Sequence, residues 1–255
     1  MKPKNDLSKI NELSDVIKKE DFIFPDTNIF IPGLVDDNGR FRDFNYICRE
    51  IKQNNELYPT ILKFFKTYCN NLSIIYSLCN IVLPIEIRNE LEKFYDSYVK
   101  RERGIGSILD NLNDRKNRIR SGMYEIKKRI KFYSDMKKLI KIAKGILPVS
   151  KIDVITEEPN GTYQNIYDFV RFTARRVYFD AKDEDIISDA DRALVAHAIY
   201  YSTKNNARSF IMSRDSHIRN ICHTLKKDKQ DFSFLKSASV MLLYFESNNL
   251  LKEEF

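Results

Sequence analysis

Apolar residues along this chain alternate between short continuous runs and longer stretches with helical spacing. The short runs predict buried strands at 22–25, 81–84, 209–213 and 240–245. We expect 240–245 to be the last strand of the chain. The stretches with three- and four-residue spacing predict helices, at 7–17, 47–51, 61–72, 85–91, 164–178 and 188–201. Strands that alternate with helices favour an α/β sandwich over a small, mostly parallel sheet.

The pattern changes between about residues 96 and 148. Apolar residues recur at helical spacing from Met123 to Ala143 and are separated by basic residues, which predicts a long amphipathic helix. We interpret this segment as a helical insertion, with breaks at Gly104, Gly106 and Gly122. The expected organisation is an N-terminal amphipathic helix at 1–20 and one α/β domain at 21–255, interrupted by the insertion at about 96–148.

Basic charge is concentrated in this insertion. Between Lys100 and Lys144, fifteen Lys and Arg and five Asp and Glu give a net charge of +10, which leaves −3 for the rest of a chain whose net charge is +7. Such a segment favours contact with nucleic acid, because phosphate contacts supply most non-specific affinity. The alternatives are a solvated face and a surface for an acidic protein. The candidate contacts are Arg115, Lys116, Arg118, Arg120, Lys127 and Lys128.

A second, smaller basic patch is expected on the helix at 164–178. Arg171, Arg175 and Arg176 alternate there with Phe172 and Tyr178, on which a base could stack. Arg214, next to a predicted strand end, is a further candidate for nucleic-acid contact.

Cysteine use and apolar run length indicate a cytoplasmic protein with no membrane contact. The four cysteines show no paired spacing typical of zinc sites, and we expect reduced thiols. The N-terminus is too charged for a signal peptide, and the longest apolar run near the C-terminus, ASVMLLYF, is too short to span a membrane.

Acidic residues stand where predicted strands end or helices begin. Asp26 follows the strand at 22–25, Asp215 follows the strand at 209–213, Asp191 opens a helix, and Glu90 lies on the helix after the strand at 81–84. In a parallel sheet such positions can meet at one edge. Two carboxylates about 4 Å apart repel by on the order of 4 kcal/mol at an effective dielectric near 20, so a divalent cation would relieve the site. Oxygen ligands suit Mg²⁺ or Mn²⁺.

Four segments containing these residues resemble, in order, the motifs of PIN-domain nucleases. They are FPDTNIF, LPIEIRNEL, ISDADRALVAHAI and FIMSRDSHI. The resemblance covers about residues 21–98 and 150–245. It implies a PIN-like α/β/α sandwich and a divalent-metal-dependent endoribonuclease, which hydrolyses RNA phosphodiester bonds with metal-activated water. It also implies that Asp26, Glu90, Asp191 and Asp215 hold one or two Mg²⁺ or Mn²⁺ ions. Thr27, Asn28 and Ser213 would orient these ligands.

Several of these positions have a second interpretation. Asp26 could cap a turn, and Ser188 with Asp191 has the spacing of a helix-capping box. Asp189 is the rival ligand to Asp191, and Glu86, one helical turn before Glu90, is the rival ligand to Glu90.

The expected partner is RNA, with DNA as the alternative, and a homodimer or an antitoxin-like protein partner is compatible with the family. Two other functions remain open. The chain could be a non-catalytic PIN-like module that binds RNA or protein, or a structure-specific DNA nuclease.

Overall fold

The computed structural model describes two compact units of the chain. The residues described are 16–30, 34–35, 41–42, 44–78, 80–118, 121–146, 153–154, 161–178, 187–229, 231–246 and 249–255. The helical unit comprises Met1–Asn5, Ile31–Leu72 and Glu92–Pro148. The sheet unit comprises Asp6–Phe30, Ser73–Leu91 and Val149–Phe255.

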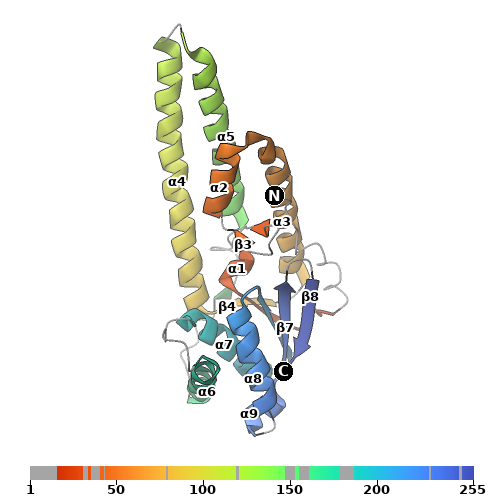
Figure 1. Cartoon of the computed structure of the whole chain (residues 1–255). Helices are drawn as coiled ribbons and strands as arrows, with labels where there is room; N and C mark the ends of the chain where they lie inside the picture. Colours follow the sequence, from red (N-terminus) through yellow and green to blue (C-terminus); the bar gives the residue numbers. More distant parts are fainter. Residues whose placement is uncertain are drawn as a thin grey trace. The chain divides into compact units, whose positions relative to one another are not determined.

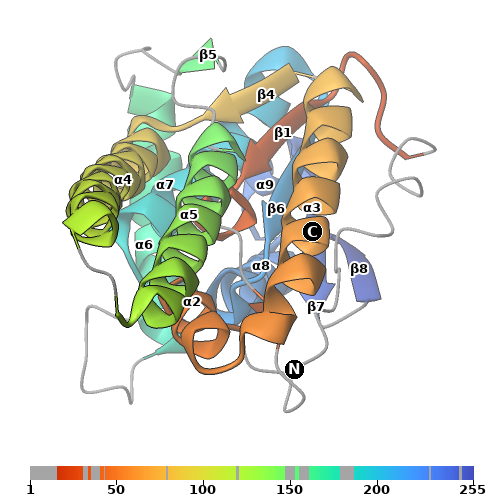
Figure 2. The same cartoon turned by 90° about the horizontal axis from the view of Figure 1, so that it is seen from above.

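The sheet unit is built on a mixed sheet with strand order β5-β4-β1-β6-β7-β8. The strands are β1 (Phe22–Pro25), β4 (Asn80–Leu83), β5 (Asp153–Val154), β6 (Arg208–Ser213), β7 (Ser239–Glu246) and β8 (Asn249–Glu254). All neighbouring pairs are parallel except β7 with β8. Figure 2 shows β1 between β4 and β6.

The register of β1 with β6 places two predicted site residues at the same edge. Phe22 pairs with Ser209 and Pro25 with Met212, so Asp26 follows β1 beside Ser213, the last residue of β6. The Asp26 N–H donates to the Met212 carbonyl at 2.9 Å, which extends the pairing by one residue. Residues 209–213 of β6 are all buried, although alternate residues point to opposite faces. Both faces of this central strand are therefore covered.

The helices of the sheet unit lie around this central strand. They are α1 (Thr27–Phe30), α6 (Gly161–Val177), α7 (Asp189–Asn205), α8 (Ser216–Asp228) and α9 (Ser233–Ser237). Helix α7 contacts β1, β6 and β7, and α6 packs on α7 and α8 (Figure 1). The apolar residues of α7 are buried around most of its circumference, which fits a helix enclosed by other elements. The loops after β1 and β6 and the beginning of α7 thus belong to one well-packed unit.

The helical unit contains most of the predicted insertion. Its elements include α2 (Phe44–Gln53), the 3₁₀ helix η2 (Asn55–Leu57), most of α3 (Tyr58–Leu78), α5 (Met123–Ile146) and the two-residue strands β2 (Leu34–Val35) and β3 (Phe41–Arg42). Helix α4 (Ile85–Arg118) begins in the sheet unit and continues into the helical unit. An ion pair of 2.5 Å between Lys144 of α5 and Glu102 of α4 joins the two long helices.

The predicted breaks at Gly104 and Gly106 are wrong, because α4 runs through both residues without interruption. Each glycine costs a helix interior only about 1 kcal/mol relative to alanine. Such a cost is small enough for a helix of 34 residues to continue through both glycines. The predicted break at Gly122 is confirmed, since this residue has a φ of +78° and lies just before α5.

The sequence predictions of strands and helices in the sheet unit are largely confirmed, and the chain is an α/β protein with a mostly parallel mixed sheet flanked by helices. Calling 240–245 the last strand is wrong, because β8 follows β7 in an antiparallel hairpin. Its sequence NLLKEE lacks the apolar run that marks the buried strands, as is usual for an edge strand.

The helix predicted at 7–17 lies mostly outside the described residues. None of the helices that are described combines the length and the apolar character required to cross a bilayer.

Candidate functional site

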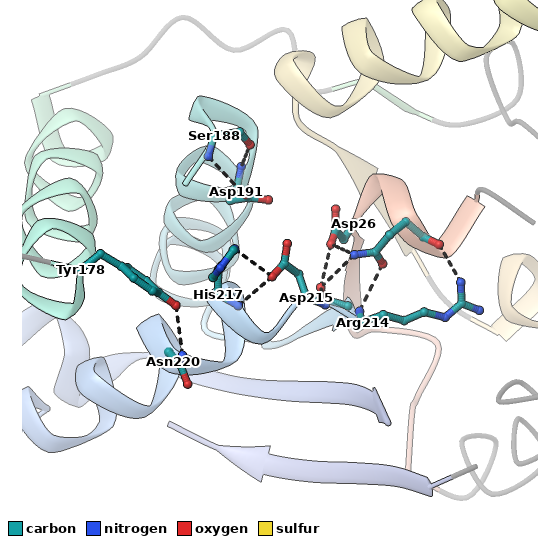
Figure 3. A network of polar contacts seen from close by, with 10 residues as sticks. Asp26, Tyr178, Ser188, Asp191, Arg214, Asp215, His217 and Asn220 are labelled. Atoms are coloured by element: carbon teal, nitrogen blue, oxygen red, sulfur yellow. Dashed lines mark hydrogen bonds and ion pairs between the residues drawn. The ribbon is translucent and has the colours of Figure 1, made fainter. Parts of the chain in front are cut away.

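Asp26 is a buried carboxylate at the carboxyl edge of the sheet. It follows β1 directly, and only 4% of its surface is exposed. Its Oδ2 accepts a hydrogen bond from the Ser213 hydroxyl at 2.7 Å and a second one from the Asn28 side-chain amide. Figure 3 shows these contacts at the end of β1 and β6. Ser213 at the end of β6 and Asn28 in α1 thus fix the orientation of Asp26.

Burial and other carboxylates oppose ionisation of Asp26. Loss of solvent raises its pKa most, followed by the charges of Asp191, Asp215 and Glu90, while the hydrogen bond from Ser213 lowers it. The outcome is a pKa of about 7, compared with 3.8 for an ordinary aspartate. A carboxylate that charges with difficulty in isolation is a ready acceptor for a cation.

We call Asp26, Glu90, Asp191 and Asp215 the acidic cluster, because charges within this group raise the pKa of Asp26 and of Asp191. Asp191 also contributes to the N-terminal cap of α7. Its backbone N–H donates to the Ser188 hydroxyl at 3.1 Å, and its Oδ2 accepts from the Ser188 N–H at 3.1 Å. The capping box expected from the sequence is therefore confirmed. Burial, followed by the charge of Asp215, raises the pKa of Asp191 to about 6. Capping and membership of the acidic cluster are compatible at this residue.

Glu90 is connected to the cluster through α1. Thr27, the first residue of α1, donates its hydroxyl proton to Glu90 Oε2 at 2.6 Å, across 63 positions of sequence. The charge of Glu90 contributes to the raised pKa of both Asp26 and Asp191. The α4 helix therefore brings Glu90 into electrostatic contact with the two aspartates.

Glu86, the rival to Glu90, faces different groups. Its charge raises the pKa of Tyr163. Its Oε2 atom is buried and accepts no hydrogen bond from the residues that the structure describes. Glu86 is not among the residues that raise the pKa of Asp26, and this difference in surroundings favours Glu90 as a member of the cluster.

Asp215 begins α8 and links the cluster to a histidine. Its Oδ1 accepts the backbone N–H of His217 at 2.7 Å, as an N-cap does, and its own N–H donates to the Ser213 hydroxyl at 2.9 Å. The His217 Nδ1 lies 3.3 Å from the same Oδ1. The hydroxyl of Ser213 is thus shared by the Asp26 side chain and the Asp215 backbone.

Asp189, the rival to Asp191, points to other partners. It forms an ion pair with Arg192 and accepts a hydrogen bond from the Tyr167 hydroxyl at 3.1 Å. The hydrogen bond from Arg192 lowers the pKa of Asp189, and its side chain is 74% exposed. This carboxylate is already neutralised by a cation at the surface, so it has less need of a metal ion than Asp191.

The ligand atoms of the acidic cluster are of the type that a hard divalent cation prefers, but the side chains are not arranged around a common ion position. The four predicted ligands offer oxygen atoms only, which Mg²⁺ and Mn²⁺ prefer. Within the described ranges, however, no group of three or more His, Cys, Asp or Glu side chains could hold a metal ion as it stands. Asp191 and Asp215 each spend one oxygen on a helix cap, so binding of a common ion would require their side chains to turn.

The three predicted orienting residues all contact the acidic residues. Ser213 and Asn28 donate to Asp26, and Thr27 donates to Glu90. The Asn28 side-chain oxygen also accepts the Arg214 N–H at 3.2 Å. Their proposed function in metal binding stays a prediction, although their contacts match it.

The candidate nucleic-acid contacts are spread over both units. In the helical unit, Arg115 and Arg118 at the end of α4 and Lys127 and Lys128 at the beginning of α5 are exposed, and Lys116 is half-buried. Arg120 lies outside the described residues. In the sheet unit, Arg171 and Arg175 are exposed on α6, whereas the guanidinium of Arg214 donates to the Asn28 carbonyl at 2.7 Å. Arg214 therefore contributes to the packing around Asn28.

A short network next to Asp215 was not anticipated from the sequence. The Tyr178 ring meets the His217 ring edge to face at 5.2 Å, and the Tyr178 hydroxyl accepts the Asn220 amide at 3.0 Å (Figure 3). His217 links this pair to Asp215, since its Nδ1 lies 3.3 Å from Asp215 Oδ1. The available signal was its position two residues after a helix-capping aspartate, where a side chain can turn back towards the cap.

Comparison of the chain with protein-family models, curated proteins and solved structures found no match. The candidate function therefore rests on the residues and their geometry.

Proposed function

We propose that this protein is a PIN-like, divalent-metal-dependent nuclease whose substrate is RNA. The observation that carries the proposal is the position of Asp26, which is buried at the carboxyl edge of the sheet within reach of the charges of Asp191, Asp215 and Glu90 and is held there by Ser213. Mutual repulsion of this size disfavours folding, so a cluster of this kind is expected where a cation or a proton compensates it. Mg²⁺ or Mn²⁺ is the cation that fits oxygen ligands.

The proposed reaction is hydrolysis of a phosphodiester bond. A bound Mg²⁺ or Mn²⁺ would supply an activated water and would offset the charge that develops on the phosphate. Asp26, Glu90, Asp191 and Asp215 would hold the ion. Asp26 loses its proton on binding, because metal ligation requires the carboxylate form.

The chain's own hydrogen bonds would keep these ligands in place. Ser213 at the end of β6 and Asn28 in α1 hold Asp26, and Thr27, also in α1, holds Glu90. Fixed partners of this kind commonly orient metal ligands, and their loss typically costs 10- to 100-fold in affinity or activity. In the helical unit, exposed Lys and Arg at the end of α4 and the beginning of α5 are further candidates for phosphate contacts.

Cleavage of single-stranded RNA with and without Mn²⁺ tests the proposal. We expect cleavage by the wild type with Mn²⁺ and a loss of about a hundredfold or more in Asp26→Asn, which corresponds to roughly 3 kcal/mol of transition-state stabilisation. This change removes the charge but little volume. Asp231→Asn is the matched control, because Asp231 is an exposed aspartate that belongs neither to the acidic residues around Asp26 nor to α6. Equal cleavage by Asp26→Asn and wild type would refute the assignment.

A non-catalytic binding module is the second candidate. Two observations favour it, namely the use of Asp191 and Asp215 as helix caps and the lack, among the described residues, of a group arranged to hold a metal ion. RNA binding with no cleavage under Mg²⁺, Mn²⁺, Co²⁺ or Ca²⁺ would support this candidate. The same assay with flap DNA of matched sequence separates an RNA nuclease from a structure-specific DNA nuclease.

A further inference from the structure

Helix α6 presents an aromatic ring bordered by arginines on the outside of the sheet unit. Phe172 is 57% exposed, the most exposed phenylalanine among the large apolar residues of the described chain. Arg175 and Arg176 follow it at three and four residues, and Arg171 precedes it. On a helix surface, residues three and four apart are neighbours, so Arg175 and Arg176 lie beside Phe172, and Arg171 lies beside Arg175. Here they form the α6 platform, defined as Arg171, Phe172, Arg175 and Arg176.

The ring of Phe172 is held in place although it is exposed. The guanidinium carbon of Arg176 lies 5.8 Å from the ring centroid, in the range of a cation–π contact. Arg176 in turn forms an ion pair of 2.9 Å with Asp228 at the end of α8. The ring therefore contacts an arginine that is itself held by an ion pair, and Arg171 and Arg175, which are one helical turn apart, remain exposed next to it.

The α6 platform is connected to the acidic cluster through the end of its own helix. Tyr178 follows α6, packs edge to face on His217, and accepts a hydrogen bond from Asn220 of α8. His217 lies against Asp215. Six residues separate Phe172 from Tyr178, about 9 Å along a helix at 1.5 Å per residue. The platform and the cluster thus belong to one unit and are linked through Tyr178 and His217.

We infer that the α6 platform binds one unpaired base of a single-stranded nucleic acid, by stacking on Phe172 and by phosphate contacts to Arg171 and Arg175. This inference rests on the proposed function and deepens it, because it states the substrate as single-stranded. Positive charge around an exposed ring matches a polyanion whose bases have free faces. A base within a duplex is stacked on its neighbours and cannot cover the ring unless it leaves the stack.

The test compares affinities for a short single-stranded RNA and for the same RNA in a duplex, by fluorescence anisotropy in EDTA, where cleavage does not interfere. We expect Phe172→Ala to weaken single-strand binding by between about fivefold and a hundredfold, the range found when a stacking aromatic residue is replaced by alanine. Duplex affinity changes little. Phe172→Trp restores binding, because a larger ring still stacks, and Phe94→Ala, another exposed phenylalanine, leaves single-strand binding unchanged.

Two results would overturn the inference. One is wild-type affinity of Phe172→Ala for the single strand, which would assign the exposed ring to another partner such as a protein. The other is an equal loss for single strand and duplex, which would show that the ring does not read unpaired bases. Cleavage that persists in a binding-neutral Phe172→Ala would refute the platform and leave the nuclease proposal standing. Binding that depends on Phe172 without any cleavage would support the platform and refute the nuclease proposal.

Discussion

The two ends of β1 each carry a buried aspartate, and the two differ in what surrounds them. Asp21 precedes the strand, and Asp26 follows it. Only 2% of Asp21 and 4% of Asp26 is exposed. Arg208, at the beginning of β6, donates to both oxygens of Asp21 at 2.6 and 3.1 Å. Asp26, next to the end of the same β6, has three other carboxylates nearby in place of an arginine.

This difference separates a structural carboxylate from a candidate functional one. A bidentate arginine neutralises Asp21 and ties β1 to β6, and the Lys18 N–H adds a hydrogen bond at 2.7 Å. The charge of Asp21 is therefore compensated within the folded protein at this end of β1. At the other edge, hydroxyl and amide donors orient Asp26 but do not cancel its charge. Perturbed pKa values of this kind are concentrated at functional sites. The predictions below distinguish a structural role for Asp21 from a functional role for Asp26.

Asp21→Asn should have the largest effect on stability. It leaves Arg208 without its carboxylate partner, and breaking a buried ion pair costs up to about 3 to 5 kcal/mol. Because Arg208 is 37% exposed and keeps a bond to the Val16 carbonyl, we expect a loss of about 2 to 3 kcal/mol, the lower part of that range. Urea unfolding measures it. Cleavage per folded molecule should stay at the wild-type level, and a stability change below about 0.5 kcal/mol would contradict the assigned structural role.

Asp26→Asn should have the opposite sign in metal-free buffer. At pH 8 the wild type must hold a charged carboxylate whose pKa is raised by burial and by Asp191, and the amide removes that cost. We expect a gain of about 1 to 3 kcal/mol in the free energy of unfolding, because the pKa of Asp26 is about 7 in the folded protein and near 3.8 in the unfolded chain. Destabilisation at pH 8 would mean that the charge is compensated in the folded protein.

The wild type should also lose stability as pH rises through the raised pKa of Asp26. The folded protein keeps this proton up to about pH 7, whereas an unfolded aspartate with a pKa near 3.8 has released it. The native state binds more protons than the unfolded chain between about pH 4 and 7. The contribution of Asp26 to the free energy of unfolding therefore falls as the pH rises through that range. Comparing wild type with Asp26→Asn in urea at pH 5 and pH 8 isolates the effect. The difference should be small at pH 5 and largest at pH 8.

Ser188→Ala should produce the smallest effect and should distinguish the two uses of Asp191. Removing an N-cap hydroxyl costs about 1 kcal/mol, which thermal unfolding can detect. The Asp191 carboxylate remains, so cleavage should stay within a fewfold of wild type. Asp191→Asn should abolish cleavage instead. If the two variants lose activity equally, Asp191 acts only through its cap.

Much of the sheet unit and of the acidic cluster could be predicted from the sequence, because the relevant signals are local. A buried apolar run ending in Asp26, with Thr27 and Asn28 after it, indicates a strand end, and Ser188 with Asp191 indicates a helix start. The ion pair of Asp21 with Arg208 and the contact of Tyr178 with His217 could not be predicted in this way. Each depends on the register of parallel strands or on helix packing across 187 and 39 positions, respectively.

The remaining errors have physical causes of the same kind. Strand β8 has few apolar residues because it is an edge strand, so its hydrophobic pattern is weak. Gly104 and Gly106 suggested breaks, but each costs a helix interior only about 1 kcal/mol, and α4 continues through both. Where tertiary contacts decide the conformation, local sequence alone gives the wrong result.

Thermal unfolding with and without Mn²⁺ at pH 7.5, on wild type, Asp26→Asn and Asp21→Asn, tests the central claim most directly. A ligand at a hundred times its Kd stabilises the native state by about 2.7 kcal/mol, which raises the Tm of a chain this size by about 5 to 10 °C. We predict that rise for wild type and for Asp21→Asn, from a lower starting Tm in the latter, and no rise for Asp26→Asn. No Mn²⁺ effect on wild type, or an equal rise in Asp26→Asn, would contradict a metal site at the carboxyl end of β1.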